Sequence, residues 1–242
     1  MTIRRMFYST VFSLLAATSL QAAPITVPTA LNPGDQYRLA FLTSGTRDAE
    51  PTDIAVYNAF VQSTADAVPE LLSLGTTWKA IASTGSVDAR DNTGTAADHT
   101  PVFLLNDTIL VDKAMDLWNT DLVDLLHPLA IDELGQLNIR SQYDRVWTGT
   151  DSTGVASPHP IGGHDTTYGH YDVVDSLYID YLGRDSHDTN TYRFYGISQV
   201  LTVVPEPSSI LLLSLAGMGA LVGYPSRKVG RNKPRAVPAW VP

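Results

Sequence analysis

The sequence Tyr37-Arg-Leu-Ala-Phe-Leu-Thr43 is followed ten residues later by Ile54-Ala-Val-Tyr-Asn-Ala-Phe-Val-Gln-Ser-Thr-Ala-Asp66. The first stretch alternates, contains aromatic residues and is typical of a β-strand. Thr52 is the expected N-cap of the second stretch, with Asp53 in the first helical turn. Apolar residues in the second stretch recur at steps of three and four, which predicts one face of an amphipathic helix, at Ile54, Tyr57, Val61, Ala65 and Val68.

The residues that follow predict short strands separated by long loops. Pro69 either ends the helix or opens a second short helix at 70–74, which Gly75 closes. Strands are expected at 77–82, in two pieces of 102–111 that turn at Asn106-Asp107, at 145–148 and at 192–203. Loops are expected at 84–100 and 155–171, and a helical turn around Met115 and Leu117. The pattern predicts an α+β fold. The alternative is a β-sandwich, against which the amphipathic stretch at 53–68 weighs.

The N-terminal residues 1–23 have the composition of an export signal. Two arginines are followed by a short apolar run and then by small residues before Pro24. This order is typical of a secretory signal peptide, and we expect cleavage after Ala22 or Ala23. The alternative interpretation is a buried N-terminal helix, in which the two arginines would need solvent beside a core.

The C-terminal part has three pieces in a defined order. The extended strip Pro205-Glu206-Pro207 is followed by the uncharged stretch 208–224. As a helix this stretch would extend about 26 Å, just short of a hydrocarbon layer of about 30 Å, so we predict a transmembrane helix. The alternative is a core helix of a soluble domain. Five cations follow and predict a stop-transfer cluster on the cytoplasmic side, Arg227, Lys228, Arg231, Lys233 and Arg235.

These three pieces together, over 205–235, resemble the PEP-CTERM sorting signal of bacterial exported proteins. The resemblance implies that an exosortase, a membrane-embedded cysteine transpeptidase, cuts in or near 205–207 and removes the tail. It also implies a Gram-negative-type bacterium that makes exopolysaccharide and biofilm. The protein would be exported through the inner membrane, anchored there, and then placed at the cell surface or in the extracellular matrix. The resemblance does not account for the tail at 236–242.

The body between the two ends, 24–204, is strongly acidic. It holds 9 of the 16 Lys and Arg but 24 of the 25 Asp and Glu, a net charge of about −15 against −9 for the whole chain. This charge argues against nucleic acid and anionic lipid as partners. It would suit divalent cations or basic partners, and the alternative is a solvated acidic surface. The chain has no cysteine, which excludes disulfides, thiolate zinc sites and cysteine nucleophiles.

Segments 37–44, 78–83 and 88–91, and most specifically Val146-Trp147-Thr148-Gly149-Thr150-Asp151, resemble bacterial C-type-lectin-like domains of unknown function. Those domains are distantly similar to the endostatin module of collagen. The resemblance covers about 37–203 and implies a double-loop fold whose first and last strands pair, with a structural role for the motif at 147–151. Such domains usually carry cysteines. Here the long-loop half must be held by packing and hydrogen bonds, or by a metal.

Two kinds of metal site fit residues in the loops. The imidazoles and carboxylate of His159, His164, His170 and Asp165 would suit zinc or another transition ion, and the alternative is a solvated polar loop. Calcium, which takes oxygen ligands, would suit the acidic stretches 88–92 and 185–190, or Asp144 with Asp151. The tripeptides by which sugar-binding C-type lectins hold calcium are absent from the sequence.

Aromatic residues of the body divide into two expected groups. Trp78, Trp118 and Trp147 lie beside apolar runs and are predicted to be in the core. Tyrosines among polar neighbours are predicted to be exposed and available to stack on sugar rings, namely Tyr168, Tyr171, Tyr178 and Tyr181. We also expect Asp88, Arg90 and Asp91 to form an ion-pair cluster that pins a loop.

The sequence contains no Gly-x-Ser-x-Gly elbow, His-Glu-x-x-His motif, phosphate loop or Gly-x-Gly-x-x-Gly motif. We therefore expect a non-catalytic, exosortase-processed protein of the envelope or matrix that binds exopolysaccharide or a matrix protein. The alternative hypothesis is an exported hydrolase that uses a metal held in the loop at 159–172.

Overall fold

The computed structural model describes residues 23–118, 125–139, 145–181, 183–186 and 190–204. The chain divides into two units, 1–203 and 204–242, and the helices and strands described all belong to the first. The sorting signal expected at 205–235, and all but the last residue of the expected signal peptide, lie outside the described residues. Within the described ranges, no helix is long and apolar enough to cross a membrane.

The larger sheet has the strand order β2-β8-β1-β3-β4, and β9 also pairs with β1. The bounds are Gln36–Leu42 for β1, Trp78–Ala80 for β2, Val102–Leu104 for β3, Ile109–Val111 for β4, Tyr195–Ser198 for β8 and Leu201–Thr202 for β9. β1 is parallel to β3, and its pairings with β8 and β9 are antiparallel. The strands predicted at 37–43, 77–82 and 102–111 are confirmed. The turn between the last two pieces is also confirmed, and Asp107 there has a φ of 70°.

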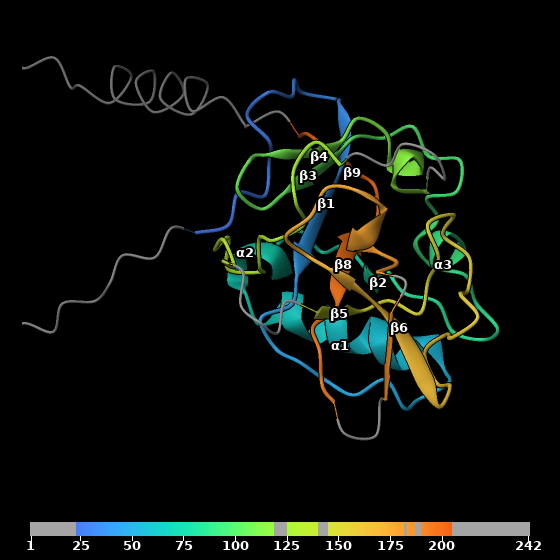
Figure 1. The fold of residues 1–242 in the computed structure, drawn as a ribbon. Coiled ribbons are helices and arrows are strands. Elements are labelled where there is room, and N and C mark those ends of the chain that lie inside the picture. Colours follow the sequence, from blue (N-terminus) through green and yellow to red (C-terminus); the bar gives the residue numbers. More distant parts are fainter. Residues whose placement is uncertain (1–22, 119–124, 140–144, 182, 187–189, 205–242) are drawn as a thin grey trace, which may run out of the picture. The chain divides into compact units, whose positions relative to one another are not determined.

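The first and last strands of the body lie next to each other, and Figure 1 shows β1 and β8 side by side in its middle. The continuous strand predicted at 192–203 is wrong, because the chain breaks between β8 and β9. At the break, Ser198 Oγ accepts a hydrogen bond from Leu39 N at 2.9 Å and donates one to Gln199 O at 2.8 Å. A side chain thus takes the place of a main-chain ladder partner.

Helix α1 (Ile54–Asp66) packs one apolar face on this sheet, as the spacing predicts. Gly196 in β8 allows the close approach, because a Cβ atom there would lie only 2.6 Å from Val61 Cγ1. The face is formed by residues that are fully buried, namely Tyr57, Val61 and Ala65.

The N-cap of α1 is Asp53, and the prediction of Thr52 is wrong by one residue. The Asp53 carboxylate accepts a hydrogen bond from Ala55 N at 2.9 Å, and its negative charge is favourable at a helix N-terminus. Pro69 opens a second helix, α2 (Pro69–Leu72), rather than only ending the first. Gly75 follows with a φ of +58°.

Two elements lie where the sequence predicts only loops. Helix α3 (Ala89–Thr93) lies inside 84–100 and ends at Gly94, which has the left-handed conformation of a C-cap. Strand β6 (Asp165–His170) lies inside 155–171. The sequence pattern missed both elements because it recognises buried positions by their apolar residues. Here several buried positions hold polar residues, namely Asn92, Thr93, Thr166 and Thr167.

A smaller antiparallel sheet has the order β5-β6-β7, where β5 is Arg145–Trp147 and β7 is Arg184–Ser186. β5 confirms the strand predicted at 145–148. Trp147 N donates a hydrogen bond to Arg193 O at 3.0 Å, which attaches this sheet to the segment that leads into β8. Two short 3₁₀ helices complete the fold, η1 (Ala114–Trp118), where a helical turn was predicted, and η2 (Ser176–Tyr178).

The coarse class is a mixed sheet with a second small sheet and few helices, which is consistent with an α+β or a β-rich fold. The largest buried side chains gather around β1 and β8 and include Trp78, Trp147, Tyr57 and Phe41. Trp118 is half-buried against the same core. The predicted core positions of the tryptophans at 78 and 147 are therefore confirmed.

Candidate functional site

The motif at 147–151 makes its contacts inside the body. Thr148 Oγ1 donates a hydrogen bond to Ile179 O at 2.6 Å, and Thr150 Oγ1 donates one to Ser83 Oγ at 2.9 Å. Gly149 has a φ of +58°, and a Cβ atom there would lie 2.5 Å from two backbone atoms, Ile161 N and Ser83 O. The motif thus connects the smaller sheet to distant loops through contacts that leave no room for a larger residue.

Asp151 ends this motif by organising the turn that follows it. Its Oδ1 accepts hydrogen bonds from Thr153 N at 2.8 Å and from Thr153 Oγ1 at 2.7 Å. Gly154 comes next and packs on the ring of Trp118, where a Cβ atom would lie 2.6 Å from Cδ2. Trp118 Nε1 in turn donates to Thr95 Oγ1 at 2.8 Å, so these loops are joined without a disulfide.

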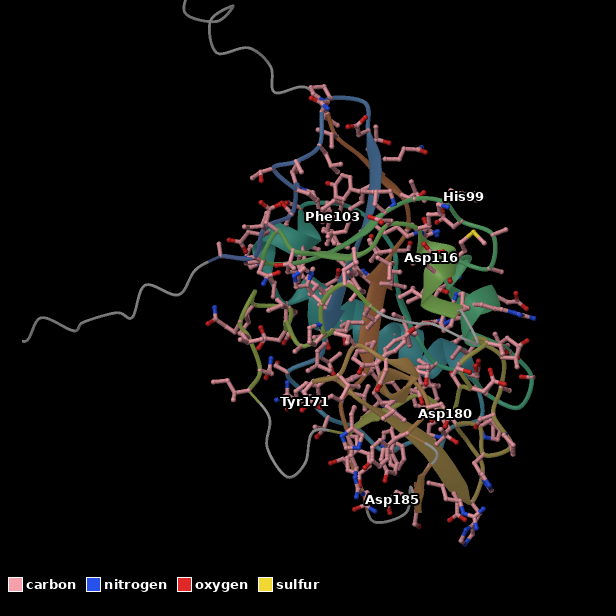
Figure 2. All side chains as sticks on the ribbon, turned by 45° about the horizontal axis from the view of Figure 1, so that its top comes forward. His99, Phe103, Asp116, Tyr171, Asp180 and Asp185 are labelled. Carbon is pink, nitrogen blue, oxygen red and sulfur yellow. The ribbon has the colours of Figure 1, made fainter. Side chains whose placement is uncertain are left out.

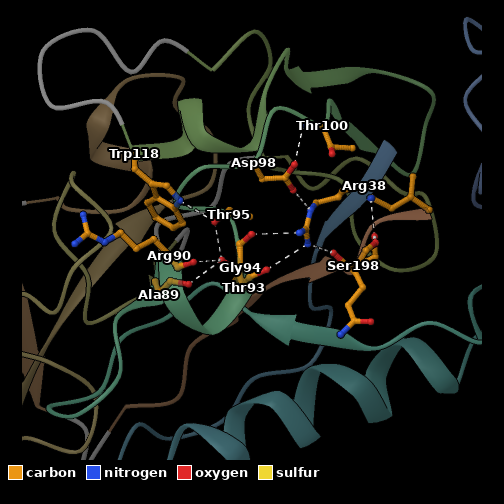
Figure 3. Close-up of polar contacts among 12 residues, drawn as sticks. Arg38, Ala89, Arg90, Thr93, Gly94, Thr95, Asp98, Thr100, Trp118 and Ser198 are labelled. Carbon is orange, nitrogen blue, oxygen red and sulfur yellow. Dashed lines mark hydrogen bonds and ion pairs between the residues drawn. The ribbon is translucent and has the colours of Figure 1, made fainter. Parts of the chain in front are cut away.

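Arg38 forms the most buried ion pair of the described body (Figure 3). Its Nε lies 2.6 Å from Asp98 Oδ2, and its Nη1 donates to Ser198 O at 2.8 Å and to Thr93 O at 3.3 Å. Nη2 donates to Gly94 O at 3.4 Å. Every nitrogen of the guanidinium is therefore used to hold the segment after α3 against β1 and β8.

The Asp98 carboxyl responds to these contacts. Burial raises its pKa, but hydrogen bonds from Thr100 and Arg38, together with the Arg38 charge, outweigh burial and leave the pKa below its ordinary value. The side chains of Arg38 and Asp98 are only 7% and 14% exposed. This pair serves the fold, because both partners are engaged within the protein.

The four residues expected to bind a transition metal do not all come together, because His170 lies apart from the other three. Within the described part of the chain, no group of three or more His, Asp and Glu side chains has an arrangement that could hold a metal ion. Asp165 and His170 stand at opposite ends of β6, five residues apart, and a strand rises about 3.3 Å per residue. The separation of about 17 Å rules out a shared ion for these two.

The Arg184 side chain contacts His159 and Asp165, two of the residues that the metal hypothesis names as ligands. Arg184 Nη1 lies 2.7 Å from His159 Nε2, and Arg184 Nε lies 3.4 Å from Asp165 Oδ2. His164 Nδ1 is 3.2 Å from Asp165 Oδ1, and its side chain is 85% exposed. His159 and Arg184 also line a pocket of about 360 Å³ together with Asp180, whereas His164 and Asp165 are not part of its lining.

The oxygens expected to bind calcium are engaged separately. Asp88 Oδ1 accepts from Ala156 N at 2.8 Å, and Asp185 pairs with Arg145. Asp144 and residues 187–189 lie outside the described residues. The loop at 88–91 is indeed pinned, but by the hydrogen bond from Ala156 and not by the expected ion-pair cluster, since Arg90 donates to Thr153 O instead.

The prediction that four tyrosines are exposed is wrong for three of them. Tyr168, Tyr171 and Tyr178 are buried, and only Tyr181 is exposed, at 42%. Their neighbours misled the prediction, because Thr166 and Thr167 are buried polar residues that read as surface. Burial raises the pKa of Tyr178 above the ordinary value for tyrosine.

Tyr181 belongs to a cluster of rings on one face of the smaller sheet. Arg145 pairs with His170 across β5 and β6, and alternation puts Tyr168 on the same face. The Tyr181 ring stacks on Tyr168, with centroids 5.7 Å apart, and lies 3.9 Å from the ring of His170. The Arg145 guanidinium lies 4.5 Å from the Tyr168 centroid, a cation–π contact.

Asp185 and Tyr192 complete this group. Arg145 Nη1 lies 2.5 Å from Asp185 Oδ2 and donates to Tyr192 Oη at 2.9 Å, while Tyr192 Oη donates to Asp185 Oδ2 at 2.6 Å. We call the six residues the Tyr168 cluster, namely Arg145, Tyr168, His170, Tyr181, Asp185 and Tyr192. It lies at the end of the body where Asp185 is labelled in Figure 2.

The electrostatics of the Tyr168 cluster differ from those of the Arg38 pair. Burial, followed by the hydrogen bond to Asp185, raises the pKa of Tyr192 to about 12. Burial lowers the pKa of Arg145, but the hydrogen bond to Tyr192 and the surrounding charges outweigh burial and raise it. Arg145 and Asp185 are nevertheless 34% and 26% exposed, so a charged pair and a tyrosine ring face solvent together.

The sequence pattern identified Tyr168 and Tyr181 as possible sugar contacts, His170 as a metal ligand and Asp185 as part of a possible calcium site, but it did not mark Arg145 or Tyr192. Arg145 lies 40 residues before Asp185 and 47 residues before Tyr192, so no local spacing marks this group. Comparison with protein-family models and with curated proteins gave no match for this chain. The assignment of a role therefore rests on the chain's own residues.

Proposed function

We propose that this chain is an exported, exosortase-processed protein of the cell envelope or extracellular matrix, with a non-catalytic body that binds matrix polysaccharide or protein. The observation that carries the proposal is the order of three pieces in the sequence. Pro205-Glu206-Pro207 precedes an uncharged stretch at 208–224, and the basic cluster at 227–235 follows. The export-type N-terminus at 1–23 agrees with this order.

The C-type-lectin-like double loop is our proposal for the finer fold. The pairing of β1 with β8 and β9 supports it, as does the long loop-rich stretch between β4 and β8. The lack of cysteine, which sets this chain apart from those domains, is matched by the contacts of Arg38 and of the motif at 147–151. The Thr148–Ile179 hydrogen bond cross-links that stretch internally, the Thr150–Ser83 bond ties it to the loop after β2, and Arg38 joins the segment after α3 to β1 and β8.

The Tyr168 cluster supports a binding role for the body. An exposed ring beside a part-exposed Arg–Asp pair offers both an apolar face and hydrogen-bonding groups to a ligand. Matrix polysaccharides and matrix proteins both have apolar faces and hydrogen-bonding groups that such a surface could contact. The net charge of about −15 keeps the exported body soluble and disfavours nucleic acid.

The experiment is mass spectrometry of the protein recovered from cells with and without an exosortase. We expect a mature chain that begins at 23 or 24, ends in or near 205–207, and is found at the surface. In cells that lack the exosortase, or in a triple variant with Pro205→Ala, Glu206→Ala and Pro207→Ala, the tail stays attached and the chain stays in the membrane fraction.

The matched control is Pro238→Ala, which also removes a proline from the C-terminal region but lies beyond the basic cluster. We expect this variant to be processed as the unchanged chain is. Recovery of the protein from the cytoplasm with both ends intact would contradict the proposal, and so would processing that is the same in the triple variant.

A further inference from the structure

We propose that the Tyr168 cluster is a binding site for a neutral pyranose unit of a polysaccharide, which stacks on Tyr181 and accepts hydrogen bonds from Arg145. This inference rests on the proposed function in that it names the ligand of the body. It assigns a site of aromatic rings and an Arg–Asp pair, with no metal ion in it.

The stacking surface is the ring of Tyr181. This ring is 42% exposed, and the rings of Tyr168 and His170 support it from within the body, at 5.7 Å and 3.9 Å. A sugar ring carries C–H groups on its faces, and a flat apolar ring that already lies in place can cover them at little entropic cost. In the described body, all other tyrosine rings of this cluster are buried, so Tyr181 presents the face.

The polar part of the site is the Arg145 guanidinium, which Asp185 holds in place. The Asp185 carboxylate itself is engaged, because Oδ1 accepts hydrogen bonds from Ser186 N and Asn190 Nδ2 and Oδ2 accepts from Arg145 and Tyr192. Within the described part of the chain, both hydrogen bonds donated by Arg145 come from Nη1, which leaves Nε and Nη2 for a ligand. A guanidinium can donate to two neighbouring oxygens in a planar arrangement. Vicinal hydroxyls of a pyranose match this geometry.

The site is held in position before any ligand arrives. Tyr192 hydrogen-bonds to both members of the pair, and its ring lies 4.4 Å from that of the fully buried Trp147. Gly183 passes over Tyr168 so closely that a Cβ atom there would lie 2.7 Å from Tyr168 Oη. A preorganised site loses little freedom on binding, which favours recognition of a weakly interacting sugar.

Charge decides between a neutral and an acidic polysaccharide. Arg145 is neutralised locally by Asp185, and the body as a whole carries about −15. A uronic acid or sulfated polymer would be repelled by this field and would find no uncompensated cation in the cluster. The ligand class that fits is therefore an uncharged polysaccharide.

The test is isothermal titration calorimetry on the full chain in detergent micelles. The probes are uncharged hexasaccharides of glucose, mannose and galactose, with hexagalacturonate as the acidic comparison. We expect at least one neutral hexamer to bind and hexagalacturonate to bind at least about tenfold more weakly. Tyr181→Ala weakens neutral binding by about tenfold, while Tyr181→Phe, which keeps the ring, stays within about twofold.

Leu137→Ala is the matched control, because Leu137 is also an exposed large side chain and lies outside the cluster. Near-ultraviolet circular dichroism of each variant verifies the fold. The proposal is overturned if none of the neutral hexamers binds, if Tyr181→Ala binds as the unchanged chain does, or if hexagalacturonate binds best. None of these results depends on export or processing, so they are distinct from a failure of the proposed function.

Discussion

Two Arg–Asp pairs of similar length lie at different places in the body. Arg38 and Asp98 are 2.6 Å apart, and Arg145 and Asp185 are 2.5 Å apart. The first pair is almost fully buried, and its arginine donates its remaining hydrogen bonds to backbone carbonyls. The second is about one third exposed, and aromatic rings surround it.

The same two side-chain types thus serve two purposes, and the surroundings decide which. Around Arg38, the protein supplies every hydrogen-bond partner, so the pair joins distant segments and has no capacity left for a ligand. Around Arg145, the described residues use one nitrogen of the guanidinium and leave an exposed ring beside it. Distance alone does not identify a functional pair, whereas burial and unused donors do.

Removing the carboxylate charge from each pair tests this comparison most strongly. Asp98→Asn leaves a buried guanidinium without its anion, and we expect the free energy of unfolding to fall by about 3 kcal/mol or more. Asp185→Asn acts on a part-exposed pair and should cost about 1 kcal/mol or less. Urea unfolding of the full chain in detergent, followed by tryptophan fluorescence, measures both. Equal losses would contradict the distinction.

Acid should weaken the contribution of the buried pair specifically. Because the Asp98 pKa is lowered in the folded state, its stabilisation is present above the unfolded-state pKa, about 4, and is lost as the pH falls through the folded-state value. The difference in unfolding free energy between the unchanged chain and Asp98→Asn should therefore narrow below about pH 4. The measurement is the urea midpoint of both proteins between pH 3 and 7. A difference that stays constant over this range would show that the pair is not the cause.

Gly94 offers a smaller perturbation on the Arg38 side. Its φ is +68°, and Gly94→Ala would place a side chain in the left-handed region, at a cost of about 1 kcal/mol. Gly85→Ala is the control, because its Cβ would meet nothing within 4 Å and its φ is not in that region. Thermal unfolding compares the two variants. The account requires Gly94→Ala to be the less stable of the two.

The smallest effect on stability is expected at the exposed ring. Tyr181→Ala should change the unfolding free energy by about 0.5 kcal/mol or less, because so much of this side chain already faces solvent. Thermal unfolding of this variant beside the unchanged chain provides the measurement. A loss of several kcal/mol would mean that Tyr181 serves the core and is not held ready for a ligand.

The elements with clear periodicity were predictable from the sequence. β1 alternates and α1 repeats its apolar residues at steps of three and four, so both were found, with the N-cap one residue away at Asp53. α3 and β6 were not found, because Asn92 and Thr166 are buried through hydrogen bonds that leave no apolar pattern. Local composition cannot indicate a polar residue that is buried through hydrogen bonds to the backbone carbonyls of other segments.

The candidate site was predictable only in part, for the same reason. Tyr181 was identified as an exposed aromatic residue, and Tyr168 was named for the wrong reason, since it is buried beneath that ring. Arg145 and Asp185 lie 40 residues apart and meet only because β5, β6 and β7 bring them to one face. The register of that sheet is what creates the site.

The central claim is that a neutral sugar ring lies on Tyr181, and saturation-transfer difference NMR tests it most directly. The full chain in detergent is irradiated at its aromatic protons in the presence of a neutral hexasaccharide that binds by calorimetry. The account predicts transfer to the protons on one face of a pyranose ring, and loss of this transfer in Tyr181→Ala. Equal transfer in both proteins, or no transfer in the unchanged chain, would contradict it.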